Sequence, residues 1–351
     1  MQDKQPTIYD VAELAGVSIA TVSRAMSGGS ISAKSRQKVE SAIEKLNYHP
    51  SALHAHTQKK RRGTLAIVVG DMDNPYCAAL CRGAEDEAQR SGYSLELYCH
   101  PTEFITCEQM IQRILAHKPD GIALTGGLVE DGTPEQILDN LNRLQREMPV
   151  VTIGPRIEGM PCINIASDSG EAVRKSMAHL INLGHRNISF IGGRRDVRFS
   201  EARTNAYYRA MAQIGVPAQD CLVYPTGFTP QSGEVGVAKL LASLEGKPLP
   251  TAILAINDVC ALGAMRQLQR AGLRVPEDIA IIGCDNLFFG QYLSPPLTTV
   301  DLRAEERGRS AMKELVHALS GGESILFDHK LECSLIVRES CGAMRSAPLY
   351  K

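Results

Sequence analysis

Polar side chains follow, or lie near, the ends of several strand-like runs in the sequence. Carboxylate, amide and guanidinium groups can each bind two neighbouring hydroxyl groups, so together they predict a site for a polyhydroxylated ligand. Taken singly, each is explained more simply as a helix cap or a surface charge, and Asp168 and Asp258 especially could be caps. The set comprises Asp71 to Tyr76, Asp168, Arg203, Asn257, Asp258, Asp285 and Asn286.

The sequence lacks the motifs of common enzyme sites. It has no Gly-x-x-x-x-Gly-Lys-Ser/Thr loop, no Gly-x-Ser-x-Gly turn and no His-Glu-x-x-His helix. Cys77 and Cys81 stand four residues apart and could form half of a metal site. Without a second pair, a helix face of small residues explains them more simply. We therefore expect no enzyme activity, no cofactor and no metal.

The first fifty residues have the pattern of a helix-turn-helix. Thr7 and Asp10 are spaced as a capping box, and Gly16 would end the helix that follows, in which Val11, Leu14 and Ala15 have helical spacing. Ser18 would cap a second helix, with Val17 and Val22 as a hydrophobic staple. A third helix begins near residue 32, and its inner face comprises Val39, Ala42, Ile43 and Leu46. A plain three-helix bundle is the alternative.

The second of these helices favours DNA contact over the plain bundle. Its polar face carries short hydrogen-bonding side chains and one arginine, which suit a helix lying in a major groove. Ile19 and Ala20 are apolar at its tip, where they could contact thymine methyl groups. The polar residues are Ser18, Thr21, Ser23 and Arg24.

Charge is distributed unevenly along the 351 residues. Residues 1–62 carry ten Lys/Arg and five Asp/Glu, a net of +5, whereas the remainder carries 38 − 10 = 28 basic and 39 − 5 = 34 acidic residues, a net of −6. A small basic module joined to an acidic body is typical of a protein that contacts nucleic acid at one end.

Beyond residue 62 the sequence alternates short apolar runs with amphipathic helical segments. The strand-like runs are 65–69, 95–98, 121–124, 150–153, 162–165, 188–191, 252–255 and 279–282, and the helical segments include 78–90, 172–183, 202–214 and 261–271. This alternation predicts an α/β fold with parallel sheets covered on both faces. About 290 residues are too many for one open sheet, so we expect two lobes with a ligand pocket between them.

The sequence also bears on location. Residues 1–6 contain no apolar segment of a secretory signal, and no apolar run approaches the ~18 residues of a membrane span. With reduced, mostly buried cysteines, the expectation is a cytoplasmic protein without membrane contact.

The N-terminal segment resembles the signature of the lactose/galactose repressor (LacI/GalR) family of bacterial transcription regulators. The resemblance rests on residues 7–24 and on residues 46–50, Leu-Asn-Tyr-His-Pro, which resemble the family's boundary between headpiece and hinge. It implies that Ile19 and Ala20 select operator bases and that Arg24 contacts a further base. Thr7, Ser18, Thr21 and Ser23 complete the expected DNA-binding set of the headpiece.

The next stretch departs from the family pattern. Residues 51–58 correspond to the family's hinge helix, which in many members inserts a leucine into the minor groove, but Thr57 stands at that position. A threonine is a poor wedge, so strong operator kinking is in doubt and Leu53 is an alternative wedge. The basic run 59–62 is interpreted as a phosphate contact, with a solvated linker as the alternative.

The body resembles the same family over nearly its full length, in the stretches 73–76, 183–193, 255–263, 282–286 and 295–299. The resemblance implies a two-lobed periplasmic-binding-protein-like domain with effector contacts from Asp168, Arg203, Asn257 and Asp285. Asp71 is a further candidate, and Tyr76 and Phe228 are candidate apolar or stacking walls. The family often has glycine followed by an aromatic residue after the arginine, whereas this chain has Ala206 and Tyr207.

These inferences give the following organisation. Residues 1–50 form a helix-turn-helix headpiece, 51–62 a hinge helix and basic linker, 63–340 an effector-binding and dimerisation domain, and 341–351 a tail. Lobe one covers about 63–164 and 295–327, and lobe two about 165–294 and 328–340. The tail contains Pro348 and no heptads, which favours a homodimer over a tetramer.

The expected function is that of a repressor that binds double-stranded operator DNA and responds to a small sugar-like effector. A purine- or nucleoside-responsive regulator of the same architecture is the first alternative. A solute-binding protein would need a signal peptide and no headpiece, and a sugar-processing enzyme would need a catalytic pair that the sequence lacks.

Overall fold

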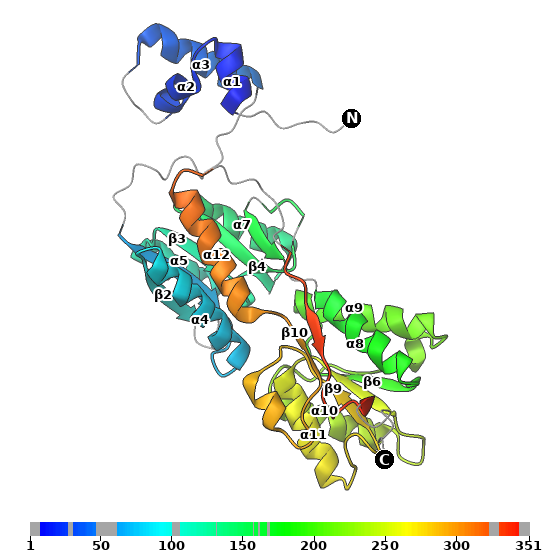
Figure 1. Cartoon of the computed structure of the whole chain (residues 1–351). Coiled ribbons are helices and arrows are strands. Elements are labelled where there is room, and N and C mark those ends of the chain that lie inside the picture. Colours follow the sequence, from blue (N-terminus) through cyan, green and yellow to red (C-terminus); the bar gives the residue numbers. More distant parts are fainter. Residues whose placement is uncertain are drawn as a thin grey trace, which may run out of the picture.

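The computed structural model describes residues 8–26, 31–46, 62–99, 106–130, 132–156, 158–160, 162–166, 169–322 and 330–343. The headpiece contains α1 (Ile8–Ala15), α2 (Ile19–Met26) and α3 (Ala33–Leu46), drawn in blue in Figure 1. Only residues 16–18 separate α1 from α2, a short turn as a helix-turn-helix requires. The predicted order of three helices is confirmed.

A small apolar core holds the three headpiece helices together. Val11, Val22 and Val39 are fully buried. Gly16 has a φ of +64°, so α1 ends there in a left-handed conformation that favours glycine. Ser18 accepts a hydrogen bond from the Thr21 backbone N–H at 3.3 Å, as predicted for a helix cap. Of the three apolar residues with helical spacing in α1, Val11 and Ala15 are buried, whereas Leu14 is 51% exposed.

Lobe one contains a five-stranded parallel sheet in the order β2-β1-β3-β4-β5. Its core has two parts, one on each face of the sheet, as expected for strands that are apolar along their whole length. The strands are β1 (Thr64–Val69), β2 (Ser94–Cys99), β3 (Gly121–Leu124), β4 (Val150–Gly154) and β5 (Ile163–Ala166). The helices are α4 (Pro75–Arg90), α5 (Cys107–His117), α6 (Gly127–Glu130), α7 (Pro134–Gln145) and α12 (Ala304–Leu319).

Lobe two repeats this plan with a four-stranded parallel sheet in the order β7-β6-β8-β9. Its strands are β6 (Ile188–Ile191), β7 (Leu222–Tyr224), β8 (Ala252–Ala255) and β9 (Ala280–Ile282). Its helices are α8 (Ser169–Asn182), α9 (Arg198–Gln213), α10 (Pro230–Ser243) and α11 (Asp258–Arg270), with the short 3-10 helices η2 (Ala218–Asp220) and η3 (Phe288–Tyr292).

The chain passes between the lobes at three places. It leaves lobe one between β5 and α8, returns between β9 and α12, and passes again through the segment that contains β11 (Ser334–Ile336). β11 pairs antiparallel with β10 (Thr299–Asp301), so two of the three crossings lie side by side (Figure 1). Both the fold class and the two-lobed arrangement agree with the prediction, while the expected residue boundaries of the lobes stay a prediction.

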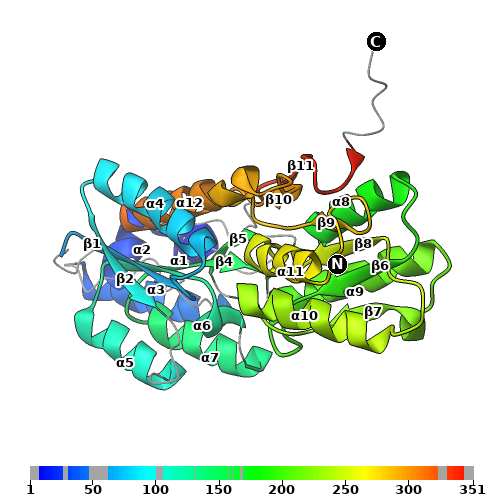
Figure 2. The same ribbon diagram turned by 90° about the horizontal axis from the view of Figure 1, so that it is seen from below.

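Each lobe contains one pair of helices in very close contact. A Cβ atom at Gly83 of α4 would lie 1.8 Å from the carbonyl oxygen of Glu305, and one at Gly308 of α12 would lie 2.0 Å from that of Leu80. In lobe two the same reciprocal arrangement joins α10 and α11, where a Cβ at Gly233 or Gly263 would collide with backbone of the other helix. Figure 2 shows both pairs, in blue and orange and in yellow and green. We call them the glycine-paired helices.

The predicted strands are found within a residue or two, whereas β7, β10 and β11 were not predicted. The departure at Ala206 and Tyr207 does not disturb packing, because both residues are buried and the Tyr207 hydroxyl donates to the Ile188 carbonyl at 2.8 Å. Among the described residues, no helix combines the length and apolar character that a membrane crossing requires.

Candidate functional site

A cavity of about 290 Å³ lies between the two lobes, at the carboxyl ends of strands from both sheets. Gly70 and Asp71 follow β1, Thr125 follows β3, and Asn257 and Asp285 follow β8 and β9. Parallel strands carry their loops at this edge, where such folds bind ligands. The cavity therefore has the position that the alternation of strands and helices predicted.

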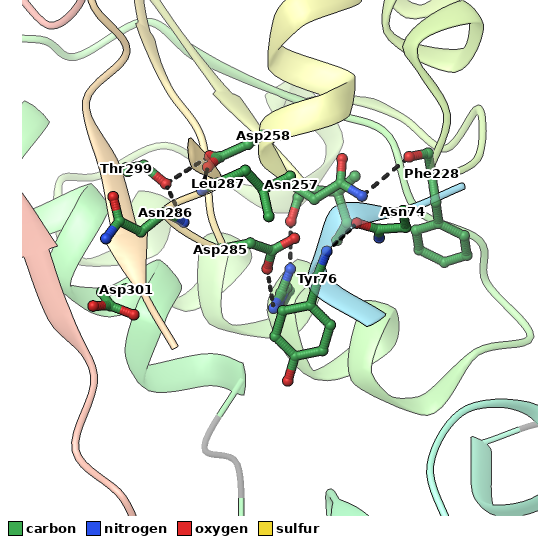
Figure 3. A network of polar contacts seen from close by, with 12 residues as sticks. Asn74, Tyr76, Phe228, Asn257, Asp258, Asp285, Asn286, Leu287, Thr299 and Asp301 are labelled. Atoms are coloured by element: carbon green, nitrogen blue, oxygen red, sulfur yellow. Dashed lines mark hydrogen bonds and ion pairs between the residues drawn. The ribbon is translucent and has the colours of Figure 1, made fainter. Parts of the chain in front are cut away.

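Six of the seven predicted effector residues line this one cavity: Asp71, Tyr76, Arg203, Phe228, Asn257 and Asp285. Figure 3 shows Tyr76, Asn257, Phe228 and Asp285 gathered in one region. The seventh, Asp168, lies outside the described residues.

Arg203, on α9, is almost fully buried at the base of the cavity. Its Nη1 donates to the carbonyl of Ile256, and its Nη2 lies 3.9 Å from Oδ1 of Asp285. The guanidinium also lies 5.2 Å from the ring centre of Phe199, one turn earlier on the same helix. Among the described residues its Nε has no hydrogen-bond partner. The side chain is therefore held in place but retains capacity to bind a ligand.

Asp285 lies opposite Arg203, at a backbone position that is unusual for an aspartate. Its φ is +120° and it is 9% exposed. Burial raises the pKa of Asp285 to about 8, although the guanidinium of Arg203 acts in the opposite direction. A carboxyl group in this state can donate as well as accept a hydrogen bond near neutral pH, which suits a ligand hydroxyl.

Asn257 caps α11 and is positioned by two hydrogen bonds. Its Oδ1 accepts from the Cys260 N–H at 2.8 Å, and its Nδ2 donates to the Phe228 carbonyl at 3.0 Å. The amide therefore joins α11 to the loop that carries the Phe228 ring, and one N–H remains for a ligand.

Asp258 was considered a possible helix cap, and this interpretation is wrong because Asn257 is the cap. The Asp258 carboxylate instead accepts from the Thr299 hydroxyl at 2.6 Å and from the Leu287 N–H at 2.7 Å. Burial raises the pKa of Asp258 to about 6. The residue ties α11 to the second crossing between the lobes, as Figure 3 shows.

Aromatic rings form one wall of the cavity. The rings of Phe228 and Phe199 are 5.1 Å apart and tilted by 33°. Tyr76 lies in the first turn of α4, where Asn74 caps the helix by accepting from the Tyr76 N–H at 3.0 Å. Burial raises the pKa of the Tyr76 hydroxyl. Apolar ring faces beside hydrogen-bonding groups are typical of small-ligand sites.

The lining residues that the sequence interpretation missed include Phe199, Glu130 and Arg307. Glu130 is buried in α6, and its Oε2 accepts from the Phe199 N–H at 3.1 Å, across the lobes. Arg307 lies on the inner face of α12 and is only 2% exposed. Its position in the sequence could have predicted this burial, because Arg307 has helical spacing with the apolar residues Ala304, Ala311 and Leu315.

The predicted DNA-binding residues of the headpiece lie on and before α2. Ser18, Ile19 and Arg24 are exposed, Ile19 at 41% despite its apolar side chain. The hydroxyl groups of Ser18 and Thr21 are 2.9 Å apart. Ala20 and Ser23 belong to the same helix, and Thr7, Leu53 and Thr57 lie outside the described residues.

The linker enters lobe one at a defined anchor. The carboxylate of Asp120 accepts from three consecutive backbone N–H groups, those of Arg62 at 2.9 Å, Gly63 at 2.8 Å and Thr64 at 3.1 Å. The Arg62 guanidinium donates to the carbonyl of His117 at the end of α5. Arg62 was predicted to contact phosphate together with the rest of the basic run. In the structure its side chain instead binds the end of α5.

The described residues contain no group of three or more histidine, cysteine or acidic side chains that could hold a metal ion. Cys77 and Cys81 lie on α4, where burial raises the pKa of the two thiols to about 12 and about 11. Both are thiols at neutral pH, which fits a packing role on the helix.

Two family models match the chain. Residues 7–51 match the model described as "Bacterial regulatory proteins, lacI family", and residues 177–341 match the "Periplasmic binding protein-like domain". The first match covers the headpiece. The second match covers most of lobe two, and it also includes α12 and the last crossing between the lobes.

Curated relatives and solved structures match over nearly the whole chain. The transcriptional regulator DegA of Bacillus subtilis is 32% identical over 97% of this chain and 99% of its own, and the transcriptional repressor CytR of Escherichia coli is 30% identical over 98% of each. The regulator CelR in complex with cellobiose has a TM-score of 0.69 and 30% identity, covering 95% of this chain and 99% of that one.

The lac repressor dimer bound to operator and an anti-inducer has a TM-score of 0.70 and 25% identity, covering 96% and 99% of the two chains. Full-length relatives that are named transcription regulators, together with the helix-turn-helix and the two-lobed body, identify a DNA-binding transcription regulator. The chain belongs to the lacI family of bacterial regulatory proteins.

Proposed function

We propose that the protein is a homodimeric repressor whose operator affinity falls when a small polyhydroxylated effector binds between its lobes. The observation that carries this proposal is the cavity itself, because it combines side chains of both lobes in a chain that also carries a DNA-binding headpiece. A ligand that contacts both lobes can prefer one of their relative arrangements, and only such a preference shifts an equilibrium.

The chemistry of the cavity supports a sugar-like ligand. Arg203, Asn257 and Asp285 supply a guanidinium, an amide and a carboxyl group, which can each form hydrogen bonds to hydroxyl groups. The paired rings of Phe199 and Phe228 supply an apolar surface against which a sugar ring can pack. The relative CelR was solved with cellobiose, which supports a sugar for this chain without naming it.

A nucleoside is the second candidate. The ring pair of Phe199 and Phe228 would also stack on a base, and Arg203 and Asn257 would bind its edge. PurR and CytR, both named as repressors, are 32% and 30% identical to this chain. A sugar and a nucleoside of similar size are therefore both included in the test below.

The route from cavity to DNA is proposed to run through lobe one. The linker that leads to the headpiece is anchored at Asp120, at the start of β1 and β3, while the cavity lies at the other end of the same strands. A change in the angle between the lobes would move these anchors in the two subunits of a dimer relative to each other. Paired headpieces would then no longer fit two operator half-sites.

The proposal is tested by a gel-shift titration of the full chain on a near-palindromic operator selected from random DNA. Specific binding should survive an excess of random competitor, and it should decrease about 5- to 150-fold with the effector, the usual range of coupling. Sugars and nucleosides would be screened first by thermal shift, since a ligand at 100 times its Kd adds ~2.7 kcal/mol of stability.

Three results would contradict parts of the proposal. Binding to all DNA sequences alike would remove sequence-specific regulation, and a bound ligand that leaves operator affinity unchanged would favour a solute-binding role. A monomer at operator-binding concentrations, measured by analytical ultracentrifugation, would exclude the homodimer. The bacterial cytoplasm is the compartment in which operator DNA is present, so cytoplasmic location is part of the same proposal.

A further inference from the structure

Arg307 is a buried cation that lines the cavity and forms no ion pair with the residues that the structure describes. It is 2% exposed and lies on α12 of lobe one, between Ala304 and Ala311 on the inner face of the helix. Among the described residues, its side chain forms no hydrogen bond and no ion pair, and its Nε is completely buried. Its backbone N–H donates to the Arg303 carbonyl at 3.0 Å, at the start of α12.

Such an arrangement is unfavourable in the absence of a ligand. Arginine remains protonated in proteins, so it cannot avoid the cost of burial by losing its charge. An ionised group removed from water normally has a hydrogen-bonded counter-charge. The other buried arginine of the cavity, Arg203, donates to the Ile256 carbonyl and lies 3.9 Å from Asp285. Within the described part of the chain, Arg307 has no such hydrogen bond and acts on Asp285 only from beyond ion-pair distance.

The carboxyl groups of the cavity do not supply the missing counter-charge. Asp285 is influenced by both arginines, but burial raises its pKa to about 8, so the carboxyl group is mostly protonated at pH 7. Glu130 is engaged by the Phe199 N–H on the other side of the cavity. Among the described residues that are buried and line the cavity, only the carboxyl group of Glu130 then remains beside the two guanidinium groups of Arg203 and Arg307.

Taking the repressor function proposed above as the basis, we propose that the effector carries an anionic group, a carboxylate or a phosphate, and that Arg307 binds this group with help from Arg203. A planar guanidinium binds either anion through two parallel hydrogen bonds. The hydroxyl-bearing part of the effector then faces Asn257 and Asp285, and its apolar face lies on the phenylalanine pair. The effector class is a sugar acid, a sugar phosphate or a nucleotide.

The first experiment uses inorganic phosphate as a minimal probe. Thermal unfolding of the full chain is followed over a millimolar range of phosphate at constant ionic strength, with chloride as the reference. Phosphate should raise the Tm of the wild type and of Lys313→Met, which removes an exposed charge from the same helix. It should not raise the Tm of Arg307→Met. Equal phosphate shifts in Arg307→Met and the wild type would overturn the anion site.

The same variants report whether Arg307 has a structural role instead. In ligand-free protein, Arg307→Met should be at least as stable as the wild type, because a similar apolar side chain replaces an unpaired buried charge. Arg307→Lys keeps the charge and should retain part of the phosphate effect. A large loss of stability in Arg307→Met without a phosphate effect in the wild type would assign the arginine to packing.

The second experiment compares neutral ligands with anionic derivatives of them: glucose with gluconate and glucose 6-phosphate, and adenosine with adenosine monophosphate. Calorimetry on the wild type should favour the charged member of any pair that binds by about 10- to 100-fold, and Arg307→Met should remove that preference. Preference for gluconate indicates a carboxylate, and preference for a phosphate ester indicates a phosphate. A neutral member that binds more tightly than its charged counterpart overturns the inference.

The outcomes separate this inference from the function on which it rests. If phosphate binds through Arg307 but no bound ligand of the panel alters operator affinity, the anion site stands and the repressor mechanism fails. If a neutral sugar or nucleoside binds and releases the operator while phosphate has no Arg307-dependent effect, the repressor mechanism stands and the anionic effector is excluded.

Discussion

The Nη2 atom of Arg203 and the Oδ1 atom of Asp285 lie 3.9 Å apart at the base of the cavity, and both side chains are almost fully buried. This distance exceeds that of a direct hydrogen bond, so the pair leaves hydrogen-bonding capacity for a third group. The two residues come from α9 and from the loop after β9. Each is fixed separately, Arg203 by the Ile256 carbonyl and Asp285 by its N–H, which donates to the Val300 carbonyl at 2.8 Å.

Replacing Arg203 should abolish the response to effector. Arg203→Ala removes the guanidinium and leaves the Ile256 carbonyl without its donor, which should cost about 1–3 kcal/mol of ligand binding or stability for each group left unpaired. Arg209→Ala, an exposed position on the same helix, is the matched control and should behave as the wild type. Calorimetry and gel-shift titration with effector are the measurements. A normal response in Arg203→Ala would show that the arginine only supports the fold.

Stability should depend on pH through Asp285. Its folded-state pKa of about 8 lies above the ordinary value of 3.8, so between these values the folded state retains a proton that the unfolded chain has lost. The contribution is therefore full below about pH 4 and is lost as the pH rises through about 8, by at most about 1.4 kcal/mol per pH unit. Urea unfolding at several pH values should show this slope in the wild type and a flatter one in Asp285→Asn.

The groups that surround Asp285 must be included in that comparison. They come from α9, α12, α11, α4 and the adjoining loop, and they include Arg203, Arg307, Asp258, Tyr76, Cys284, Cys77 and Cys260. Asp258 also has a raised pKa, of about 6, and gives a slope of the same sign at lower pH. Above pH 6, the difference in unfolding free energy between the wild type and Asp285→Asn therefore reports on Asp285. If the two plots of unfolding free energy against pH are parallel above pH 6, the raised pKa of Asp285 is contradicted.

Asp258 should be important for stability although it does not line the cavity. Asp258→Ala leaves the Thr299 hydroxyl and the Leu287 N–H buried without an acceptor, which should lower the free energy of unfolding by roughly 2–5 kcal/mol. Asp258→Asn retains one acceptor and should cost less. Urea denaturation of both variants is the measurement. An unchanged midpoint in Asp258→Ala would mean that water replaces the carboxylate.

A methyl group at either glycine of the α4–α12 pair should separate the helices. In Gly308→Ala the new Cβ would lie 2.0 Å from the Leu80 carbonyl oxygen, so backbone must move, at a cost of about 1–3 kcal/mol or more. Gly322→Ala lies beyond the end of α12, where the three nearest atoms belong to the ring of His317, a side chain end that can move, and it serves as a milder control. Thermal unfolding should rank Gly308→Ala well below this control. Equal Tm values would contradict the close packing.

Arg24 should contribute to sequence recognition. Arg24→Ala should cost about 1–3 kcal/mol of operator affinity and relax the preference at one base pair in each half-site, because an arginine on α2 can bind a guanine with two hydrogen bonds. Selection of binding sites by the two proteins from random DNA is the measurement. Uniform weakening on all sequences would instead make Arg24 a phosphate contact.

The sequence predicted the central strands because these are buried on both faces and therefore appear as continuous apolar runs. β3, β6 and β8 begin and end at the predicted residues. β7 was missed because it is a short edge strand whose three residues are only half buried. β10 and β11 pair across a long sequence separation, so their pairing depends on contacts that no local pattern contains.

Part of the site could also be predicted from the sequence, because several of its residues lie at the ends of predicted strands. Arg203, Asn257 and Asp285 follow or adjoin strands, and the edge of a parallel sheet brings such residues together. Arg307 was missed because arginines on helices usually face solvent, and only the packing of α12 on lobe one places this one inside. Asp258 shows the opposite case, since a residue at a strand end can serve the fold alone.

The glycine-paired helices limit how the molecule can move. Because backbone lies against backbone at Gly83, Gly308, Gly233 and Gly263, neither pair can slide without a collision, and each lobe has little internal freedom. Relative motion of the two lobes then depends on backbone rotations in the three crossings between them. Effector binding would then change mainly the backbone torsion angles of these crossings. A single substitution that makes a crossing more rigid would therefore alter the response to effector more than many substitutions inside either lobe.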